Sequence, residues 1–356
     1  RRKTSVLIAG LSAVAIGVAG CTGGIGSGDG GGDSDGFTVV QWGGVSQEIS
    51  YAEMFEPFAE EQGITISQDS PTDYAQLEAM VDAGQVSWDV VQGEPHFTAR
   101  ACADGKLEQL SEEVIEAAEE NGVDMDQVTE CSIPILYYTY NIAYNTDTFP
   151  DGHPTTWEEF FDTEEFPGKR GMWRSAAGAA LETALLADGV APEDLYPLDL
   201  DRAFEVLDSI REDIVWYDTG DEQIQLTASG ETPLMQAWNG RMHAAAGEGM
   251  PVANEFSENL ITYEHLMIPA GSENKELVEE WMIWYLNNME AQASYAEASN
   301  YGVPSPNALE LLDEETRDSL AGSDVVNDQA AAVMDYDYWA ENFAEVTERF
   351  NVWLAD

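Results

Sequence analysis

The sequence predicts an α/β protein of two lobes joined by two crossings of the chain, and three observations support this fold class. Apolar runs rich in β-branched residues alternate with helical patterns between residues 37 and 91, which is typical of a parallel sheet covered by helices. Two further apolar and aromatic runs, 137–145 and 260–269, lack a helical period and are long enough to connect two lobes. The chain has 356 residues, more than one hydrophobic core usually serves.

The first 36 residues are typical of an export signal and a tether. Three basic residues precede an apolar run, 6–19, which is shorter than the roughly 20 residues that a membrane-spanning helix needs. The opening Arg pair resembles a twin-arginine signal, and the four residues that end at Cys21 resemble the lipobox of prokaryotic lipoproteins. We therefore expect a signal over 1–21, a lipid on Cys21 and a flexible Gly/Ser/Asp tether over 22–36, which would hold the protein at the outer face of the cytoplasmic membrane. An ordinary cleaved signal or a short anchor, with an incidental cysteine, is the alternative.

From residue 37 the chain alternates strands and helices. The patterns predict strands at 37–42, 64–67 and 88–91, with helices at 48–61 and 74–83 between them. Ligands of such folds bind beyond the carboxyl ends of the strands. Those ends carry Trp42 and Gly43 and, after the third strand, Gln92, Gly93, Glu94 and His96.

The second half of the chain continues in the same way, without an internal repeat of fixed period. Between the two connecting runs the patterns predict helices at 176–187 and 201–210 and strands at 214–217 and 233–238. After the second run they predict helices at 275–286, 291–297 and 338–354.

The charge of the chain is strongly negative, with 14 basic and 68 acidic residues and a formal net charge of −54. Nucleic acid and anionic lipid surfaces are therefore excluded as partners, because each contact would work against long-range repulsion. The acids are dispersed and lysine is scarce, which is typical of halophilic proteins, for which molar salt shortens the Debye length to about 3 Å. Attraction of cations is the alternative explanation.

Two further cysteines, Cys102 and Cys131, are candidates for a disulfide because the chain is exported. Two buried free thiols are the alternative. Neither cysteine has a neighbouring histidine at ligand spacing, so we expect no metal site and no cofactor.

Several motifs carry a resemblance to a known family. Residues 237–240 (Ala-Trp-Asn-Gly), 263–269 (Tyr-Glu-His-Leu-Met-Ile-Pro) and 301–307 (Tyr-Gly-Val-Pro-Ser-Pro-Asn), together with 37–64 and 88–91, resemble the spermidine/putrescine-type solute-binding proteins of ABC importers in order and spacing. The resemblance implies a periplasmic-binding-protein type II fold with two hinge crossings. It also implies a monomer that captures a small organic solute and delivers it to an ABC permease and its ATPase.

The resemblance implies lobe boundaries and a pocket. Lobe 1 would comprise 37–142 with 264–308, and lobe 2 would comprise 143–263 with 309–356. Aromatic walls with carboxylates at the ends suit a polyamine, because cation–π contacts and ion pairs both strengthen when they are desolvated. The implied ligand-binding residues are two wall tryptophans, an ammonium-binding carboxylate and four neighbours: Trp42, Trp238, Glu264, Glu94, His96, Tyr263 and Tyr301. Each has a structural alternative, since a Trp at a strand end often packs into the core.

One arginine keeps an anionic or zwitterionic solute open as the alternative cargo. Arg174 precedes the helix predicted at 176–187, where the resembling family has an acidic pair that this chain lacks. An arginine and a helix start that both face the cleft would favour a carboxylate or phosphate. Pairing with a surface acid is the alternative for Arg174, and for Arg241, which follows an expected turn, we expect a structural role.

Enzymes and adhesive proteins fit the sequence less well. The chain has no Gly-x-Ser-x-Gly elbow, no His-Glu-x-x-His pair and no phosphate loop, which argues against an exported hydrolase. Repeated small β domains, which an adhesive protein would show, are also absent. The sequence thus favours a transport receptor.

Overall fold

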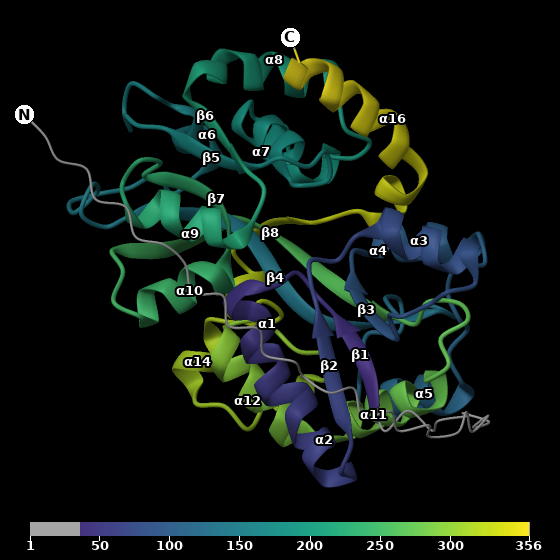
Figure 1. Cartoon of the computed structure of the whole chain (residues 1–356). Coiled ribbons are helices and arrows are strands. Elements are labelled where there is room, and N and C mark those ends of the chain that lie inside the picture. Colours follow the sequence, from purple (N-terminus) through teal and green to yellow (C-terminus); the bar gives the residue numbers. More distant parts are fainter. Residues whose placement is uncertain (1–35, 356) are drawn as a thin grey trace, which may run out of the picture. The chain divides into compact units, whose positions relative to one another are not determined.

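A computed structural model describes residues 36–355, whose strands form one nine-stranded sheet (Figure 1). The strand order is β2-β1-β3-β8-β4-β7-β5-β6, and β9 pairs with β8. The expected signal (1–21), the lipid on Cys21 and all of the expected tether except Gly36 lie outside the described residues. Within the described range, no helix is both long and apolar enough to cross a bilayer.

Three parallel strands form one side of the sheet, as the alternating pattern predicts: β1 (Gly36–Val40), β2 (Thr65–Asp69) and β3 (Val90–Gly93). A continuous helical stretch joins β1 to β2 through α1 (Gly44–Ser50), a π-helical turn (Tyr51–Phe55) and α2 (Glu56–Gln62). The next helix, α3 (Tyr74–Ala83), has the bounds expected from the sequence, because Asp73 caps its start and Gly84, with φ of 61°, ends it.

The two long connecting strands are confirmed as β4 (Ser132–Asn145) and β8 (Val252–Met267), which pair antiparallel in the middle of the sheet. The register sets Leu136 opposite Glu264, and Tyr140 opposite both Leu260 on β8 and Trp238 on β7. Both strands continue from the β1–β3 side to the β5–β7 side, so the fold has the two lobes and two crossings that were predicted.

The other side of the sheet contains β5 (Arg170–Trp173), β6 (Ile214–Tyr217) and β7 (Leu234–Trp238). Strand β5 was not predicted, because it is short and begins with a charged residue. Arg170 is nevertheless fully buried, and its guanidinium donates to the backbone carbonyls of Phe160, Asp162, Phe166 and Gly168. These bonds stabilise the charge without a carboxylate partner.

The helix predicted at 176–187 begins later, as α7 (Ala180–Ala187). Ala179 has φ of 63°, a left-handed conformation that an alanine rarely adopts, and Gly178 N–H closes a turn onto the carbonyl of Ser175. Arg174 therefore does not stand at a helix start. The prediction was wrong here because three of the four residues 176–179 are alanines, whose high helical propensity the turn overrides.

A helix also replaces the turn expected after β7, since α10 (Asn239–Gly247) begins directly at the Asn-Gly pair. The buried Asn239 side chain accepts from the amide of Thr139 at 3.0 Å and donates to the carbonyl of Asn300 at 2.6 Å. Gly240 lets the Tyr301 ring approach closely, because a Cβ at that position would lie 2.5 Å from it. The Asn-Gly pair thus serves packing rather than a turn.

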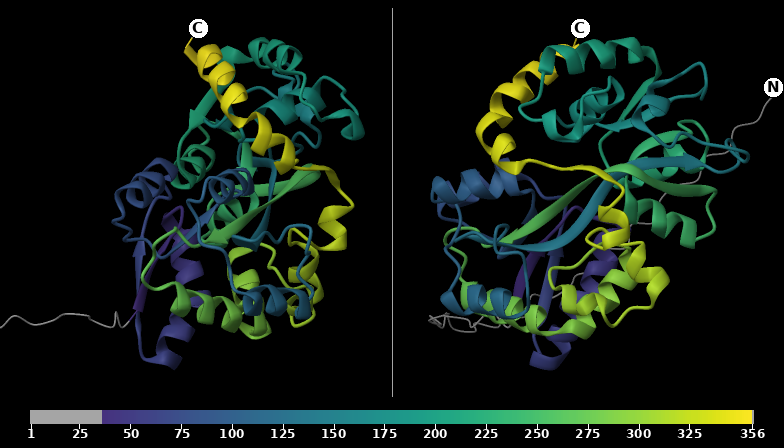
Figure 2. Two further views of the ribbon diagram at one scale, coloured as in Figure 1. Left: turned by 90° about the vertical axis from the view of Figure 1, so that its right-hand side faces the viewer. Right: turned by 180° about the vertical axis from the view of Figure 1, so that it is seen from behind.

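The last helix, α16 (Tyr336–Ala355), lies against both sides of the molecule (Figure 2). Its Phe343 stacks on His96 of α4 with ring centroids 4.4 Å apart, and its Trp353 stacks on Phe204 of α8 at 5.6 Å. The remaining elements are α4 (Pro95–Ala103), α5 (Glu112–Glu120), α6 (Trp157–Phe161), α8 (Leu200–Ser209), α9 (Gly220–Ala228), α11 (Lys275–Asn287), α12 (Met289–Ser299), α13 (Pro306–Leu309), α14 (Glu314–Asp318), α15 (Asp324–Asn327) and β9 (Ala330–Val333).

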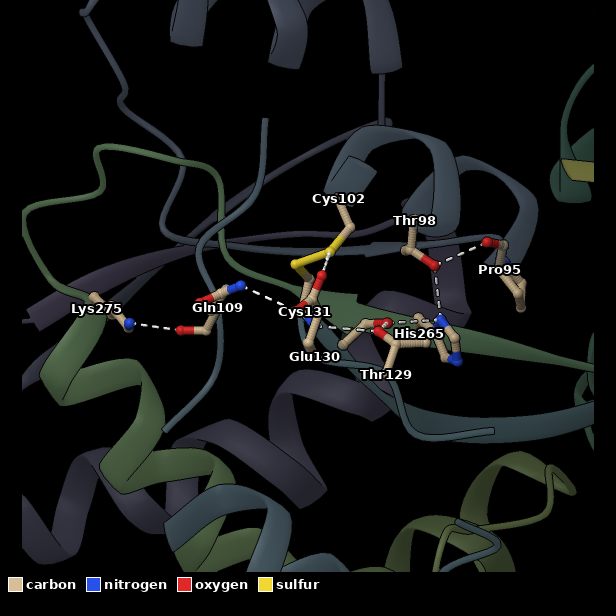
Figure 3. The surroundings of a disulfide bond; sticks show 10 residues. Pro95, Thr98, Cys102, Gln109, Thr129, Glu130, Cys131, His265 and Lys275 are labelled. Carbon is tan, nitrogen blue, oxygen red and sulfur yellow. Dashed lines mark hydrogen bonds between the residues drawn. A yellow bond between two sulfur atoms is a disulfide. The ribbon is translucent and has the colours of Figure 1, made fainter. Parts of the chain in front are cut away.

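A disulfide joins Cys102 of α4 to Cys131, directly before β4, as Figure 3 shows. The same helix is fastened a second time by Thr98, whose hydroxyl lies 2.8 Å from Nδ1 of the buried His265 on β8. Helix α4 is thereby held against the two central strands at the point where the chain leaves β3.

Candidate ligand-binding site

A cavity of about 270 Å³ lies where the ends of several strands meet. It is lined by the segment after β1, by β4 and β8 of the central pair, and by residues at the ends of β5, β6 and β7. The lining side chains that carry charge or a large ring are Trp42, Tyr138, Trp173, Asp218, Trp238, Arg241, Glu264, Tyr295 and Tyr301. Its volume is just below the roughly 300–1,000 Å³ of pockets for drug-sized molecules, which indicates a small ligand.

One end of the cavity carries a carboxyl group. Oε2 of Glu264 accepts from Nε1 of Trp42 and from Nε2 of Gln92, each at 2.7 Å. Gln92 in turn accepts from Gln41, whose Nε2 also donates to Ser50. Burial raises the pKa of Glu264, and the Trp42 and Gln92 bonds and the charge of Arg241 oppose that shift. Both bonds occupy Oε2, so Oε1 is the atom left for a ligand cation.

The second charged group of the cavity is Arg241, on the first turn of α10. It is 4% exposed, and its Nη2 donates to the carbonyl oxygen of Gly43 at 3.0 Å. Its Nη1 is buried without a hydrogen-bond partner among the described residues, and Asp221, the carboxylate nearest to it, lies 3.8 Å away and is mostly exposed. A buried guanidinium with an unused donor indicates a place for a ligand anion.

Two glycines make room for this guanidinium. A Cβ at Gly44 would lie 2.8 Å from Nη1, and one at Gly220 would lie 2.6 Å from Nε. Gly220 is also the first residue of α9, and Thr219 and Gly220 both line the cavity. The amino-terminal end of a helix favours negative charge, so α9 and Arg241 both favour a ligand anion in this part of the cavity.

The two charged groups are held at different ends of one short segment. The indole N–H of Trp42 binds Glu264, whereas the carbonyl of the next residue, Gly43, binds Arg241. Trp42 itself also lines the cavity. Trp173 and Trp238, with ring centroids 5.2 Å apart, form a wall of the same cavity.

Four of the residues that the sequence implied for ligand binding line this cavity: Trp42, Trp238, Glu264 and Tyr301. Tyr301 is buried, which raises its pKa, and the neighbouring Arg241 opposes the shift. The structure thus brings together residues from the segment after β1, from β7, from β8 and from the segment after α12.

The other four do not line it. Tyr263 precedes Glu264 on a strand, so it faces the opposite side of the sheet and lies against Tyr336, with ring centroids 5.2 Å apart. Glu94 and His96 are buried outside the cavity lining, where Glu94 bonds to Tyr74 and His96 stacks on Phe343.

Arg174 also lies off the cavity, with 48% of its side chain exposed. It pairs with Asp218 at 3.6 Å and reaches the cavity only through that lining residue. Arg174 comes before the turn that Gly178 closes onto Ser175, and α7 begins only at Ala180, so Arg174 does not lie at the start of that helix.

Sequence reasoning did not select Arg241, Gln92 or Trp173 as ligand-binding residues. The strand-end rule did point to Gln92, near the carboxyl end of β3, but not to Trp173, because β5 was not predicted. No local signal separated Arg241 from Arg174, because only the fold buries the former.

Comparison with known proteins identifies the family. Residues 53–322 match the model of the bacterial extracellular solute-binding proteins. The gamma-aminobutyric acid-binding protein of Pseudomonas aeruginosa is 31% identical over 328 residues, covering 90% of this chain and 92% of that protein. A solved structure of a GABA receptor is 37% identical with a TM-score of 0.79, covering 89% of this chain and 97% of that one. Spermidine/putrescine-binding periplasmic protein 1 of Haemophilus influenzae is 25% identical over 250 residues, covering 67% and 68%.

This chain belongs to the bacterial extracellular solute-binding proteins, receptors that bind small solutes for ABC transporters and are not enzymes.

Proposed function

We propose that this protein is the extracellular receptor of an ABC importer for a small ω-amino acid, with γ-aminobutyric acid (GABA) as the reference compound. One observation carries the proposal: the buried carboxyl of Glu264 and the buried guanidinium of Arg241 face the same small cavity. In the bound state, Oε1 of Glu264 accepts from the ligand's ammonium group and Nη1 of Arg241 donates to its carboxylate.

The separation of the two groups favours an ω-amino acid over an α-amino acid. An α-amino acid carries both charges on one carbon atom, whereas Glu264 and Arg241 are bonded to different ends of the Trp42–Gly43 segment. An ω-amino acid can place its methylene groups along the indole face and reach both. The aromatic walls then cover apolar groups and also favour the cation.

A polyamine, the cargo first suggested by the sequence, fits less well. Putrescine has about the length of GABA but ends in two ammonium groups, one of which would have to lie beside Arg241. We therefore favour the zwitterionic alternative, with Arg241 in the role that the sequence had assigned to Arg174. The names of the Pseudomonas aeruginosa relative and of the 37% identical GABA receptor support the same choice.

Closure of the two lobes is the proposed route to capture. Lobe 1 would comprise 37–142 with 264–308, lobe 2 would comprise 143–263 with 309–356, and β4 and β8 would flex between them. The hydrogen bond from Arg241 to Gly43 then connects the lobes. The closed receptor, a monomer, would deliver the solute to the permease.

We also propose where in the cell the protein acts. A lipid on Cys21, reached through twin-arginine export, would hold the receptor on its tether at the outer face of the cytoplasmic membrane. The net charge of −54 supports a halophilic source, because an apolar core under so many acids is stable only when salt screens their repulsion.

Calorimetric titration in molar potassium chloride tests the proposal with four solutes. We expect GABA to bind and its isomer α-aminobutyric acid, which carries the same two charged groups on one carbon atom, to bind at least tenfold more weakly. Putrescine has a second ammonium group in place of the carboxylate of GABA, so it tests the Arg241 end of the cavity. n-Butylamine lacks the carboxylate, so it measures binding at the Glu264 end alone. Tighter binding of putrescine than of GABA would contradict the proposed cargo and would favour a polyamine as the ligand.

A further inference from the structure

A second buried carboxyl group, that of Glu94, follows the end of β3, the strand that pairs with the strand of Glu264. The antiparallel register of β3 and β8 pairs Gln92 with Leu266 and ends with Gly93 paired with His265, and the next residues on the two segments are Glu94 and Glu264. Both side chains are buried, with exposed fractions of 6% and 7%. Like charges directly opposite each other on neighbouring strands are destabilising, and burial makes two charges still less favourable.

Hydrogen bonding distributes the charge unequally over the two acids. Glu264 accepts from two N–H donors at 2.7 Å, whereas Glu94 accepts only from the hydroxyl of Tyr74, at 3.1 Å, and its own amide donates back to that hydroxyl at 2.9 Å. Burial, and then the charge of Glu264, raise the pKa of Glu94. The negative charge therefore belongs mainly on Glu264 and the proton on Glu94.

Apart from Arg241, no charged group among the described residues around Glu94 and Glu264 offsets the repulsion between them. His96 and His265 are neutral, because burial lowers their pKa values to about 3 and about 4. The other titratable groups that act on the pair are tyrosines from α3, β4, α12, α16 and the segment after α12, and burial raises the pKa of each: Tyr74, Tyr138, Tyr140, Tyr295, Tyr301 and Tyr336.

We propose that Glu94 is the second carboxyl of the ammonium-binding end, and that the Glu94–Glu264 pair releases one proton to solvent when the ligand's ammonium group binds. This rests on the proposed function, because it assumes a cationic ligand group at Glu264. The ammonium replaces the proton as the positive charge beside two carboxyls, so Glu94 sets how strongly the site prefers a cation at a given pH. Affinity for an ammonium compound should then rise with pH by up to about tenfold per unit while the pair still holds its proton.

Proton release can be measured directly with GABA as the probe. Titration calorimetry in two buffers of different ionisation enthalpy gives the number of protons released per ligand, and we expect a value approaching one near neutral pH. Glu94→Gln keeps the shape and the acceptor for Tyr74 but removes the second acid, so it should release less than half as much. The matched control is Glu182→Gln, which removes a buried carboxyl outside the cavity and should leave the release unchanged. A wild-type release near zero between about pH 5.5 and 8.5 would overturn the proposal.

A second measurement needs no ligand and separates this proposal from the proposed function. Carboxyl infrared difference spectra of the ligand-free protein should contain a protonated acid that titrates above about pH 6 and is lost in Glu94→Gln. If GABA does not bind but the band of the wild type is reduced in Glu94→Gln, the cargo is wrong and the shared proton stands; Glu182, whose pKa burial also raises to about 7, contributes equally to both spectra. If the band is the same in wild type and Glu94→Gln, the shared proton is refuted whatever the ligand.

Discussion

Replacement of Arg241 by glutamine tests the carboxylate-binding end of the cavity. The change removes a buried positive charge and the unused Nη1 donor, while the amide can still fill part of the space between Gly44 and Gly220. We expect GABA to lose most of its affinity, because its carboxylate would enter the cavity without a charged partner.

The size of the effect follows from the burial of the guanidinium, which is 4% exposed. Removing one partner of a buried, hydrogen-bonded charge pair costs about 2–5 kcal/mol, which corresponds to a roughly 30- to 5,000-fold rise in Kd. Calorimetric titration with GABA in molar salt measures this rise. Putrescine should show the opposite trend in the same variant, because loss of the arginine removes a repulsive charge from its second ammonium group.

The matched control is Arg174→Gln, which removes an arginine of similar sequence context whose side chain is 48% exposed and off the cavity. Its only charged partner here is Asp218 on the rim, so the Kd for GABA should change less than about threefold. The reasoning would be refuted if Arg174→Gln lost affinity and Arg241→Gln did not. Equal melting temperatures of the two variants would show that folding is not the cause.

Three further outcomes are expected. Gly220→Ala should weaken GABA binding at least tenfold, because its Cβ would lie 2.6 Å from the buried guanidinium, whereas Gly247→Ala, with open space around it, should not. Burial raises the pKa of Glu182 to about 7, so its contribution to stability is present at low pH and falls by about 3 kcal/mol between about pH 4.5 and 7; thermal unfolding of Glu182→Gln should lack that fall. Replacing both Cys102 and Cys131 by serine should cost about 3–4 kcal/mol in denaturant unfolding, because the bond closes a loop of 29 residues.

The fold was predictable wherever local pattern and tertiary structure agree. Helix α3 has an Asp cap and a terminal glycine, and β4 and β8 are apolar on both faces because they run through the middle of the sheet. The starts of α7 and α10 were not predictable. One depends on the left-handed backbone of Ala179, and the other on an Asn239 side chain that bonds to two distant segments.

The site was predictable in its carboxylate and its walls but not in its arginine. Glu264, Trp42 and Trp238 stand in motifs or at strand ends, where a rule of the fold already points to ligands. Arg241 and Arg174 each follow a tryptophan closely, and the sequence around them does not say which one is buried. That depends on space left by two glycines from distant parts of the chain, Gly44 and Gly220, which only the folded structure brings together.

In the proposed binding mode, Arg241 would link recognition of the solute to closure of the receptor. Its Nη2 is already bonded to the Gly43 carbonyl after β1, while its backbone belongs to α10 after β7, so this bond can form only when those two segments are close. A ligand carboxylate on Nη1 would neutralise the guanidinium in the same arrangement, and the ammonium end would bind Glu264 on β8. A solute shifts a conformational equilibrium only by its differential affinity for the two states. Under the proposed binding mode, a zwitterion that bridges Glu264 and Arg241 would have that difference, because it could make both contacts together only when the lobes are closed, whereas a monoamine would make only the contact to Glu264.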